Sequence, residues 1–420
     1  MLEESLFTPN RFWHNKHLTV KKIATEYRKR LIGEFLYVMY INYNKRSRRF
    51  SLQNAGGCFK AVFSPATIPS QKIMKTNNPV CVTGASGFIA AHIVRELLER
   101  GYRVKGTVRK SSENYPFLLS LPGAKERLEL VKADLLTAGA YDRVVEGCDT
   151  VMHTASPYKI NVKNPQIDLV DPAVTGTENV LESCLKSGSV KRLIFTSSIA
   201  AITDEPESTK VFTEKDWNTM SSLDRNPYHY SKTLAEREAW DFIMRKRPKF
   251  DLVVINPVFV IGPSLSSSLN TSNGMIRDIM SGVYPCIMDL NWGFVDVRDV
   301  AKAHILAMET DTASGRYLCA DEAIHMRELV TLLKSSGFET YSLPKVDLSG
   351  AVGSLLMKVL SFTQPRDTGM YIRTNIGRTL RYDNTKIRRE LGLSFRAVRE
   401  SMIESVNDMV KWGHLSPSKH

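Results

Sequence analysis

The sequence has few cysteines and no long apolar run, and these two absences exclude several classes of protein. Its six cysteines are scattered through 420 residues, without a C-x-x-C pair and without histidines nearby at metal-ligand spacing. We therefore expect neither a disulfide scaffold nor a metal site, and reduced thiols are the default. The longest apolar stretch, residues 31–43, contains Glu34 and falls short of the roughly 18 residues that a membrane span needs. The sequence predicts a soluble, cytoplasmic protein with no membrane span.

Positive charge is concentrated at the start of the chain. The net charge is +13, but residues 1–78 hold 14 Lys or Arg against four Glu, which accounts for +10 and leaves +3 for the rest. Because the remainder is almost neutral, we predict no nucleic-acid partner. Residues 1–78 are expected to form a basic, partly disordered extension. Apolar residues at helical spacing between Val20 and Leu31 leave organelle targeting through this extension as an alternative.

From Pro79 onward, short apolar strands alternate with amphipathic helices. This alternation predicts an α/β fold with a Rossmann-type, doubly wound parallel sheet. Strands are expected at 79–83, 102–108, 128–132, 149–154, 192–196 and 252–256, and helices at 88–100, 173–186, from about 227, and at 297–309, 326–336 and 397–412. Residues 264–274 read as a Ser/Asn-rich loop.

A glycine-rich turn lies directly between the first strand and the first helix, in the sequence TGASGFIA at 83–90. Glycine permits a tight turn and a close approach to a pyrophosphate, and the helix start offers unpaired N–H groups. Ala90 stands where a third glycine is common, and it still allows close helix–strand packing. The turn predicts a dinucleotide site formed by Gly84, Ser86, Gly87, Phe88 and Ile89.

The second strand carries no acidic residue at its end. An NAD-binding unit usually places Asp or Glu there to bond the ribose 2′-hydroxyl. Here Arg109 and Lys110 follow the strand, and a guanidinium can meet a 2′-phosphate with two donors. We therefore predict NADP(H) as the cofactor. Asp134, next to Leu135 after the third strand, is expected on the adenine side.

A tyrosine and a lysine share one face of the helix that begins near residue 227. Tyr228 and Lys232 are four residues apart, whereas Tyr230 points elsewhere. A nearby ammonium favours phenolate and so makes a phenol a better proton donor near neutral pH. Ser198, at the carboxyl end of the fifth strand, is predicted to bond the substrate oxygen, with Ser197 as the alternative. The predicted catalytic residues are Ser198, Tyr228 and Lys232.

Taken together, these motifs resemble the extended short-chain dehydrogenase/reductase superfamily, and within it the dihydroflavonol-4-reductase-like branch with its cinnamoyl-CoA and aldehyde reductases. The likeness runs from about Val80 to Trp412 in ordered blocks. They are VTGASGFIA (82–90), GTVRK (106–110), VKADL (131–135), FTSS (195–198), YHYSKTLAEREAW (228–240), NPVFVIGP (256–263), FVDVRDVAKAH (294–304) and GRYLCADE (315–322).

The resemblance implies a role for further residues. Ser198, Tyr228 and Lys232 match the family's catalytic triad, and Arg109 matches its NADP-selecting arginine. The loop after His153 (Thr154, Ala155 and Ser156) would lie under the nicotinamide ribose, whose hydroxyls Lys232 would bind, and Pro257 and Val260 would line the nicotinamide face. The strand–helix alternation loosens after Pro257, and this change divides the chain into an NADP-binding core with the catalytic residues at 79–257 and a mainly substrate-binding subdomain at 258–415, with elements that return to the core.

Two departures broaden the expected substrate. Asn226 and Pro227 precede Tyr228, where cinnamoyl-CoA reductases usually carry Asn-Trp, and residues 199–203 lack the asparagine of the flavonoid enzymes. The expected reaction is NADPH-dependent reduction of a small aldehyde or ketone, by a monomer or homodimer. The alternatives are a hydroxysteroid dehydrogenase or nucleotide-sugar epimerase/dehydratase on the same scaffold, and a non-catalytic NADP-binding sensor.

Overall fold

A computed structural model describes residues 78–156, 162–207 and 209–417. The strands of its main sheet are β1 (Val80–Thr83), β2 (Val104–Val108), β3 (Leu128–Lys132), β4 (Thr150–His153), β5 (Arg192–Thr196), β6 (Asp251–Pro257) and β10 (Gly315–Cys319). The helices around that sheet are α2 (Phe88–Glu99), α3 (Pro116–Leu119), α4 (Ala124–Arg127), α5 (Asp142–Val145), α6 (Asp171–Ser187), α7 (Pro227–Lys246), α9 (Val297–Glu309) and α13 (Thr385–Leu391).

The seven strands form one parallel sheet in the order β10-β6-β5-β4-β1-β2-β3. The chain runs outward from β1 through β2 to β3 and then returns to β4 on the other side of β1. In open α/β sheets this reversal point is where ligands bind, beyond the carboxyl ends of the strands. The loops after β1, β4 and β5 therefore meet at one edge.

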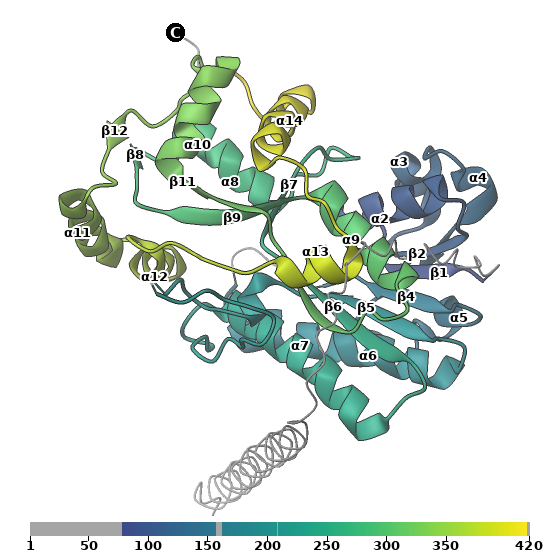
Figure 1. The fold of residues 1–420 in the computed structure, drawn as a ribbon. Coiled ribbons are helices and arrows are strands. Elements are labelled where there is room, and N and C mark those ends of the chain that lie inside the picture. Colours follow the sequence, from purple (N-terminus) through teal and green to yellow (C-terminus); the bar gives the residue numbers. More distant parts are fainter. Residues whose placement is uncertain (1–77, 157–161, 208, 418–420) are drawn as a thin grey trace, which may run out of the picture. The chain divides into compact units, whose positions relative to one another are not determined.

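Helices cover both faces of the sheet (Figure 1). α2 packs against α9 on one face, and α6 packs against α7 on the other. Successive strand residues alternate between the two cores: Val82 and Met152 face α2 and α9, whereas Cys81 and Val151 face α6 and α7. The strands are apolar on both sides because both sides are buried, as in other parallel sheets.

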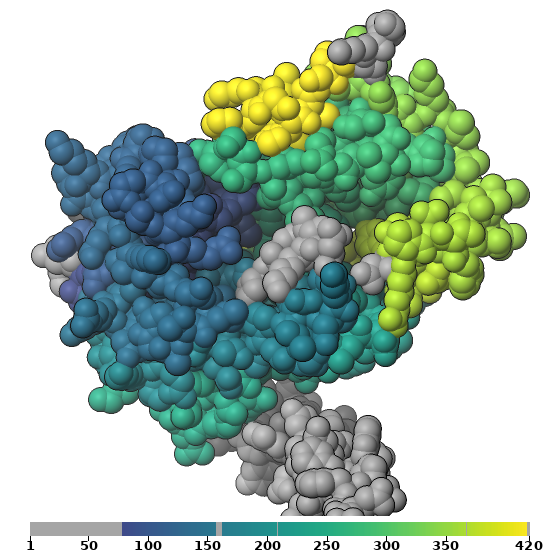
Figure 2. Space-filling model, turned by 180° about the vertical axis from the view of Figure 1, so that it is seen from behind, coloured from purple at the N-terminus to yellow at the C-terminus, as the bar shows by residue number. Residues whose placement is uncertain are grey.

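A smaller unit follows β6. It contains a three-stranded sheet of β7 (Phe259–Ile261), β9 (Asn291–Asp296) and β11 (Glu322–His325), and the pair β8 (Cys286–Ile287) and β12 (Val346–Asp347). Its helices are α8 (Thr271–Met280), α10 (Met326–Leu333), α11 (Ala351–Leu360), α12 (Arg366–Asn375) and α14 (Val398–Lys411). It has its own apolar core around Trp292, Phe294 and Met402. Figure 2 shows α11 and α12 (yellow-green) on the opposite side of the rear face from residues 78–150 (purple and blue).

The fold class predicted from the sequence is confirmed, with local corrections. The expected loop at 264–274 is wrong at its end, because Thr271 already begins α8. The helix expected at 326–336 changes to a wider turn at Lys334, and Gly337 adopts φ 87°, which ends regular helix. Strands expected at 102–108 and 149–154 are shorter. The basic extension before Asn78 lies outside the described residues. None of the described helices is long and apolar enough to cross a membrane.

Candidate active site

The glycine-rich turn after β1 is shaped for close approach by a ligand. Gly84 has φ +65°, and a Cβ there would come within 3.1 Å of Ala155, so a larger residue would be both strained and crowded. The Gly84 N–H donates to Thr107 Oγ1 (2.9 Å), which ties the turn to β2. Gly87 caps α2 without any side-chain hydrogen bond, leaving backbone donors at the helix start. This arrangement fits a dinucleotide phosphate, with Ser86, Phe88 and Ile89 flanking it.

Thr83 organises the neighbouring loop after β4. Its hydroxyl accepts the N–H groups of Thr154 (3.1 Å) and Ala155 (3.0 Å) and lies 2.8 Å from His153 Nδ1. Because both lone pairs are then used, the hydroxyl hydrogen points to Nδ1, and His153 carries its own hydrogen on Nε2. Burial, with a contribution from Lys232, lowers the pKa of His153 to about 3, so the ring stays neutral. The loop 153–156 is thus fixed against the glycine turn.

The first two turns of α7 present Tyr228 and Lys232. Pro227 occupies the first helical turn, where its missing N–H is not needed, and Asn226 precedes it in a left-handed conformation. The Lys232 ammonium donates to Ser156 Oγ (3.0 Å) and lies 6.0 Å from the centre of the Tyr228 ring. Tyr228 and Lys232 therefore lie on one face of α7, as their i, i+4 spacing predicts, and Lys232 also reaches the loop after β4.

Lys232 is only partly exposed, and the surrounding protein displaces much of the water around its ammonium. This burial lowers the pKa of Lys232 to about 8. Strongly shifted pKa values in a partly exposed lysine are typical of functional sites. The lysine can thus change its charge close to neutral pH.

The two serines after β5 have different roles. Ser198 is partly exposed, and its hydroxyl accepts the Ala200 N–H (3.2 Å) at the start of the short helix η3 (Ile199–Ala201). Ser197 is 4% exposed, and its hydroxyl donates to Glu236 (2.6 Å). These contacts favour Ser198 over Ser197, the alternative catalytic serine, because the Ser197 hydroxyl is used inside the protein. η3, which directly follows Ser198, packs against α7, the helix that carries Tyr228 and Lys232.

A buried carboxylate supports this serine loop from behind. Glu236, one turn after Lys232, accepts hydrogen bonds from Ser197, from Asn256 Nδ2 (2.7 Å) and from Arg316 Nε (2.6 Å). Asn256 also donates to the Ser198 carbonyl (3.2 Å). The Glu236 carboxylate is fully buried, and Arg316 is 6% exposed. The backbone of Ser197 and Ser198 is therefore held between β6 and α7.

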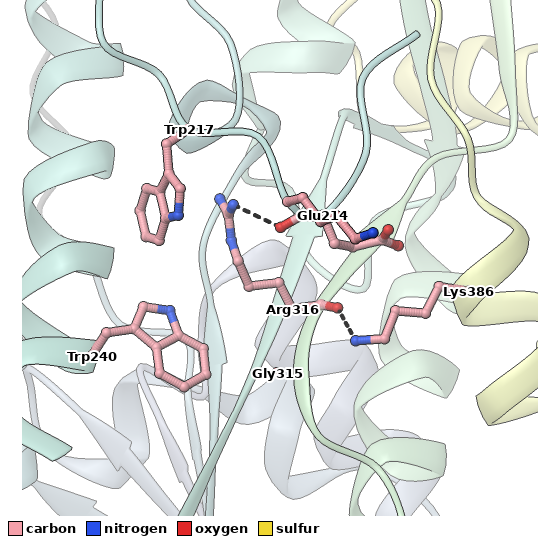
Figure 3. Close-up of a pocket in the computed structure, with 7 residues that line it drawn as sticks. Glu214, Trp217, Trp240, Gly315, Arg316 and Lys386 are labelled. Atoms are coloured by element: carbon pink, nitrogen blue, oxygen red, sulfur yellow. Dashed lines mark hydrogen bonds between the residues drawn. The ribbon is translucent and has the colours of Figure 1, made fainter. Parts of the chain in front are cut away.

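Arg316 extends the same network to the surface. Figure 3 shows its guanidinium beside Trp217, with one nitrogen donating to the Glu214 carbonyl. The guanidinium lies 4.0 Å from the Trp217 ring centre, and Trp240 lies below Trp217 in this view, on the same side of Arg316. These residues line a shallow pocket of about 430 Å³ at the start of β10. Because Gly315 is at the amino end of that strand, this pocket is separate from the carboxyl edge that holds Lys232.

The remaining predicted cofactor residues lie around the glycine-rich turn after β1. Arg109 and Lys110 are exposed after β2, and within the described residues the Arg109 guanidinium has no hydrogen-bonded or ionic partner. The Asp134 carboxylate accepts the Leu136 N–H (2.9 Å), and Leu135 packs onto Gly176 of α6. Pro257 ends β6, and Val260, in β7, is 7% exposed. They lie at the carboxyl ends of β2, β3 and β6, or just beyond, as expected for a dinucleotide site.

Thr83, Glu236, Asn256 and Arg316 were not identified as site residues from the sequence. One signal was available for three of them: polar residues interrupt apolar stretches at the end of β1, near the end of β6 and within β10. For Glu236, the spacing of four residues from Lys232 was the only clue.

Comparisons with known proteins agree with this geometry. Residues 80–320 match the family model described as the NAD dependent epimerase/dehydratase family. The chain belongs to this family. It is 48% identical over 264 residues to cinnamoyl-CoA reductase CAD2 of Medicago truncatula, covering 61% of this chain and 80% of that protein. It is 37% identical over 356 residues to cinnamoyl-CoA reductase 2 of the same plant, covering 84% of this chain and 97% of that protein.

Solved structures of related proteins have the same fold. Yeast methylglyoxal/isovaleraldehyde reductase Gre2, complexed with NADPH, has a TM-score of 0.67 and 30% identity, covering 80% of this chain and 100% of that one. Tetraketide alpha-pyrone reductase 1 and dihydroflavonol 4-reductase, both of Arabidopsis thaliana, are each 36% identical. The resemblance to the extended reductases and their dihydroflavonol-4-reductase-like branch is confirmed. The relatives are oxidoreductases, as expected from the motifs.

Proposed function

We propose that this protein reduces an aldehyde or ketone to an alcohol with NADPH, using Ser198, Tyr228 and Lys232. One observation carries the proposal: the Lys232 ammonium lies between Ser156 Oγ (3.0 Å) and the Tyr228 ring (6.0 Å to its centre) at the carboxyl edge of the sheet. A reduced nicotinamide supplies a hydride when bound. The relatives named above are reductases, and Gre2 is complexed with NADPH, which supports the choice of reaction and cofactor.

Each residue has a distinct task in this proposal. Ser198 donates a hydrogen bond that orients the substrate carbonyl oxygen. Tyr228 delivers its phenolic proton to that oxygen as the oxygen gains charge. The Lys232 ammonium stabilises the phenolate that remains. Gly84, Gly87 and the start of α2 hold the pyrophosphate, while Arg109 and Lys110 receive the 2′-phosphate.

The direct test is consumption of NADPH by purified protein with a panel of carbonyl compounds. The panel should contain short aldehydes, ketones, hydroxycinnamoyl thioesters and dihydroflavonols. The last two classes are included because related proteins are named as reductases of cinnamoyl-CoA and of dihydroflavonols. We expect one class to be reduced with formation of one alcohol per NADPH consumed. Inertness toward every carbonyl, combined with conversion of a nucleotide sugar or oxidation of a hydroxysteroid, would reject the proposal.

Replacing Arg109 by alanine is expected to raise the KM for NADPH about tenfold or more and to change the KM for NADH less than about threefold. The physical reason is that a guanidinium meets a phosphate with two charge-assisted hydrogen bonds, which NADH cannot form. Initial rates with each cofactor measure this. Arg103→Ala, at the exposed opposite end of β2, is the control and should leave both constants unchanged. Equal effects of Arg109→Ala on the two cofactors would contradict the assignment.

The pH profile of carbonyl reduction is expected to fall above about pH 8. Burial lowers the pKa of Lys232 to about 8, so its ammonium is present below that pH and is lost above it. The phenolate left on Tyr228 then has no positive neighbour, and kcat/KM declines as pH rises. Lys232→Arg keeps the charge and should move the decline to higher pH. A wild-type profile that stays flat to pH 9.5 would argue against this role.

A further inference from the structure

The residue before the α7 helix has an unusual backbone conformation. Asn226 has φ 49° and ψ 60°, and Asn226 and Arg247 are the two non-glycine residues with positive φ in the described part of the chain. Asparagine tolerates this region better than most residues, but the conformation still needs support from its surroundings. It sits two residues before Tyr228, so it determines the direction in which the helix begins.

That support comes from a buried carboxylate. The Asp204 side chain is fully buried; its Oδ1 accepts Asn226 Nδ2 (2.9 Å), and its Oδ2 accepts Arg225 Nε (2.7 Å). A buried carboxylate is tolerated only when hydrogen-bond donors satisfy it. Both donors in this case belong to the two residues that lead into Pro227 and Tyr228. We call the bond between Asp204 and Asn226 the latch.

The latch joins the two segments that carry the catalytic groups. Asp204 follows Ser198 by six residues, beyond the short helix η3, and Asn226 precedes Tyr228 by two. η3 is itself fixed, since Asn218 donates from Nδ2 to the Ala200 carbonyl (2.8 Å) and from its backbone N–H to the Ala201 carbonyl (3.0 Å). Movement of Asn226 would therefore change the separation of Tyr228 from Ser198 without disturbing Ser198.

A second ionic contact lies beside the latch and does not touch Asn226. Glu205 accepts Arg225 Nη2 (2.5 Å) with one oxygen and Arg378 Nη1 (2.6 Å) with the other. The Glu205 side chain is 20% exposed, whereas the Asp204 side chain is fully buried. Because Glu205 contacts the same Arg225 but not Asn226, Glu205→Gln is the control that weakens the neighbouring ionic contacts and leaves the latch in place.

We propose that Asp204 and Asn226 are positioning residues that set where the Tyr228 phenol stands relative to Ser198 during carbonyl reduction. The proposal rests on the proposed function of Tyr228. A loop contact that serves folding alone would affect thermal stability but not turnover by the folded enzyme. A positioning contact affects kcat, because a displacement of about 1 Å can lower a rate by about 10²-fold.

The decisive variant is Asn226→Gly. Glycine adopts positive φ freely, so the backbone turn is retained while the amide that bonds Asp204 is removed. We expect kcat to fall about tenfold or more, with the affinity for NADPH changed less than about threefold. Asp204→Ala should lower kcat at least as much. Glu205→Gln should leave kcat within about twofold. A glycine variant with wild-type kcat would overturn the proposal, even if its melting temperature dropped.

A second measurement tests, without any substrate, whether the latch stabilises the start of α7. The Tyr230 N–H donates to the Asn226 carbonyl (3.1 Å) in the first turn of α7. Amide hydrogen exchange at Tyr230 should be about tenfold faster or more in Asn226→Gly than in wild type and unchanged in Glu205→Gln. Unchanged exchange in the glycine variant would also overturn the latch. A wild type that reduces no carbonyl would instead reject the proposed function, while the exchange result would still decide whether the latch holds α7.

Discussion

Replacing Tyr228 by phenylalanine is expected to lower kcat for carbonyl reduction by about 10²- to 10⁴-fold, the range that loss of a general acid gives. The substitution removes only the phenolic oxygen. It keeps the aromatic ring, whose centre lies 6.0 Å from Lys232 Nζ. Lys232 keeps its bond to Ser156, so the loop after β4 should remain in place. Binding of NADPH, measured by fluorescence titration, should therefore change less than about threefold.

Tyr230→Phe provides the matched control for this experiment. It removes the same atom from the same helix two residues further on, where the side chain points away from Lys232. We expect kcat to stay within about twofold of the wild type. If Tyr228→Phe retained most of the activity, or if Tyr230→Phe lost it, Tyr228 would not be the proton donor. Measuring Ser198→Ala beside Ser197→Ala would separate a hydroxyl that bonds substrate from one that bonds Glu236.

The parts of the site that sequence alone predicted are those set by local spacing. The turn from Gly84 to Gly87 lies between a strand and a helix, and its geometry follows from glycine and from the helix start. Tyr228 and Lys232 share a helix face because they are four residues apart. The parallel sheet follows from the alternation of strands and helices. The glycine turn and the Tyr228–Lys232 pair are each determined within a few residues of the chain, whereas the sheet is indicated by a pattern that repeats along the whole core.

The parts that could not be predicted depend on residues far apart in the chain. Neighbouring serines 197 and 198 look alike in sequence, and only the carboxylate of Glu236 behind one of them shows which is buried. Glu236 in turn bonds to Arg316, 80 residues away. The bond from Asp204 to Asn226 spans a long connection between η3 and α7. Such pairings need tertiary structure, because periodicity indicates burial without naming the partner.

Arg316→Met is expected to destabilise the protein by about 3–5 kcal/mol, because it leaves the fully buried Glu236 carboxylate without its cationic partner. The guanidinium also donates to the backbone carbonyls of Glu214 (3.0 Å) and Asp216 (2.5 Å), which the variant would leave without this donor. Such a loss is a large part of the stability of a typical domain. Urea unfolding, followed by circular dichroism, measures it through the midpoint and slope.

Arg389→Met is the control for the same change on the surface. The Arg389 side chain is 71% exposed and pairs with Glu390 at 3.0 Å, so its removal should cost less than about 1 kcal/mol. Arg316→Lys should recover part of the stability, since it restores the charge but not the hydrogen bonds that the guanidinium makes to both the carboxylate and the carbonyls. Similar unfolding midpoints for Arg316→Met and Arg389→Met would show that the neutral donors Ser197, Asn256 and Trp240 satisfy Glu236 without Arg316. The buried ion pair would then have no part in holding the serine loop against α7.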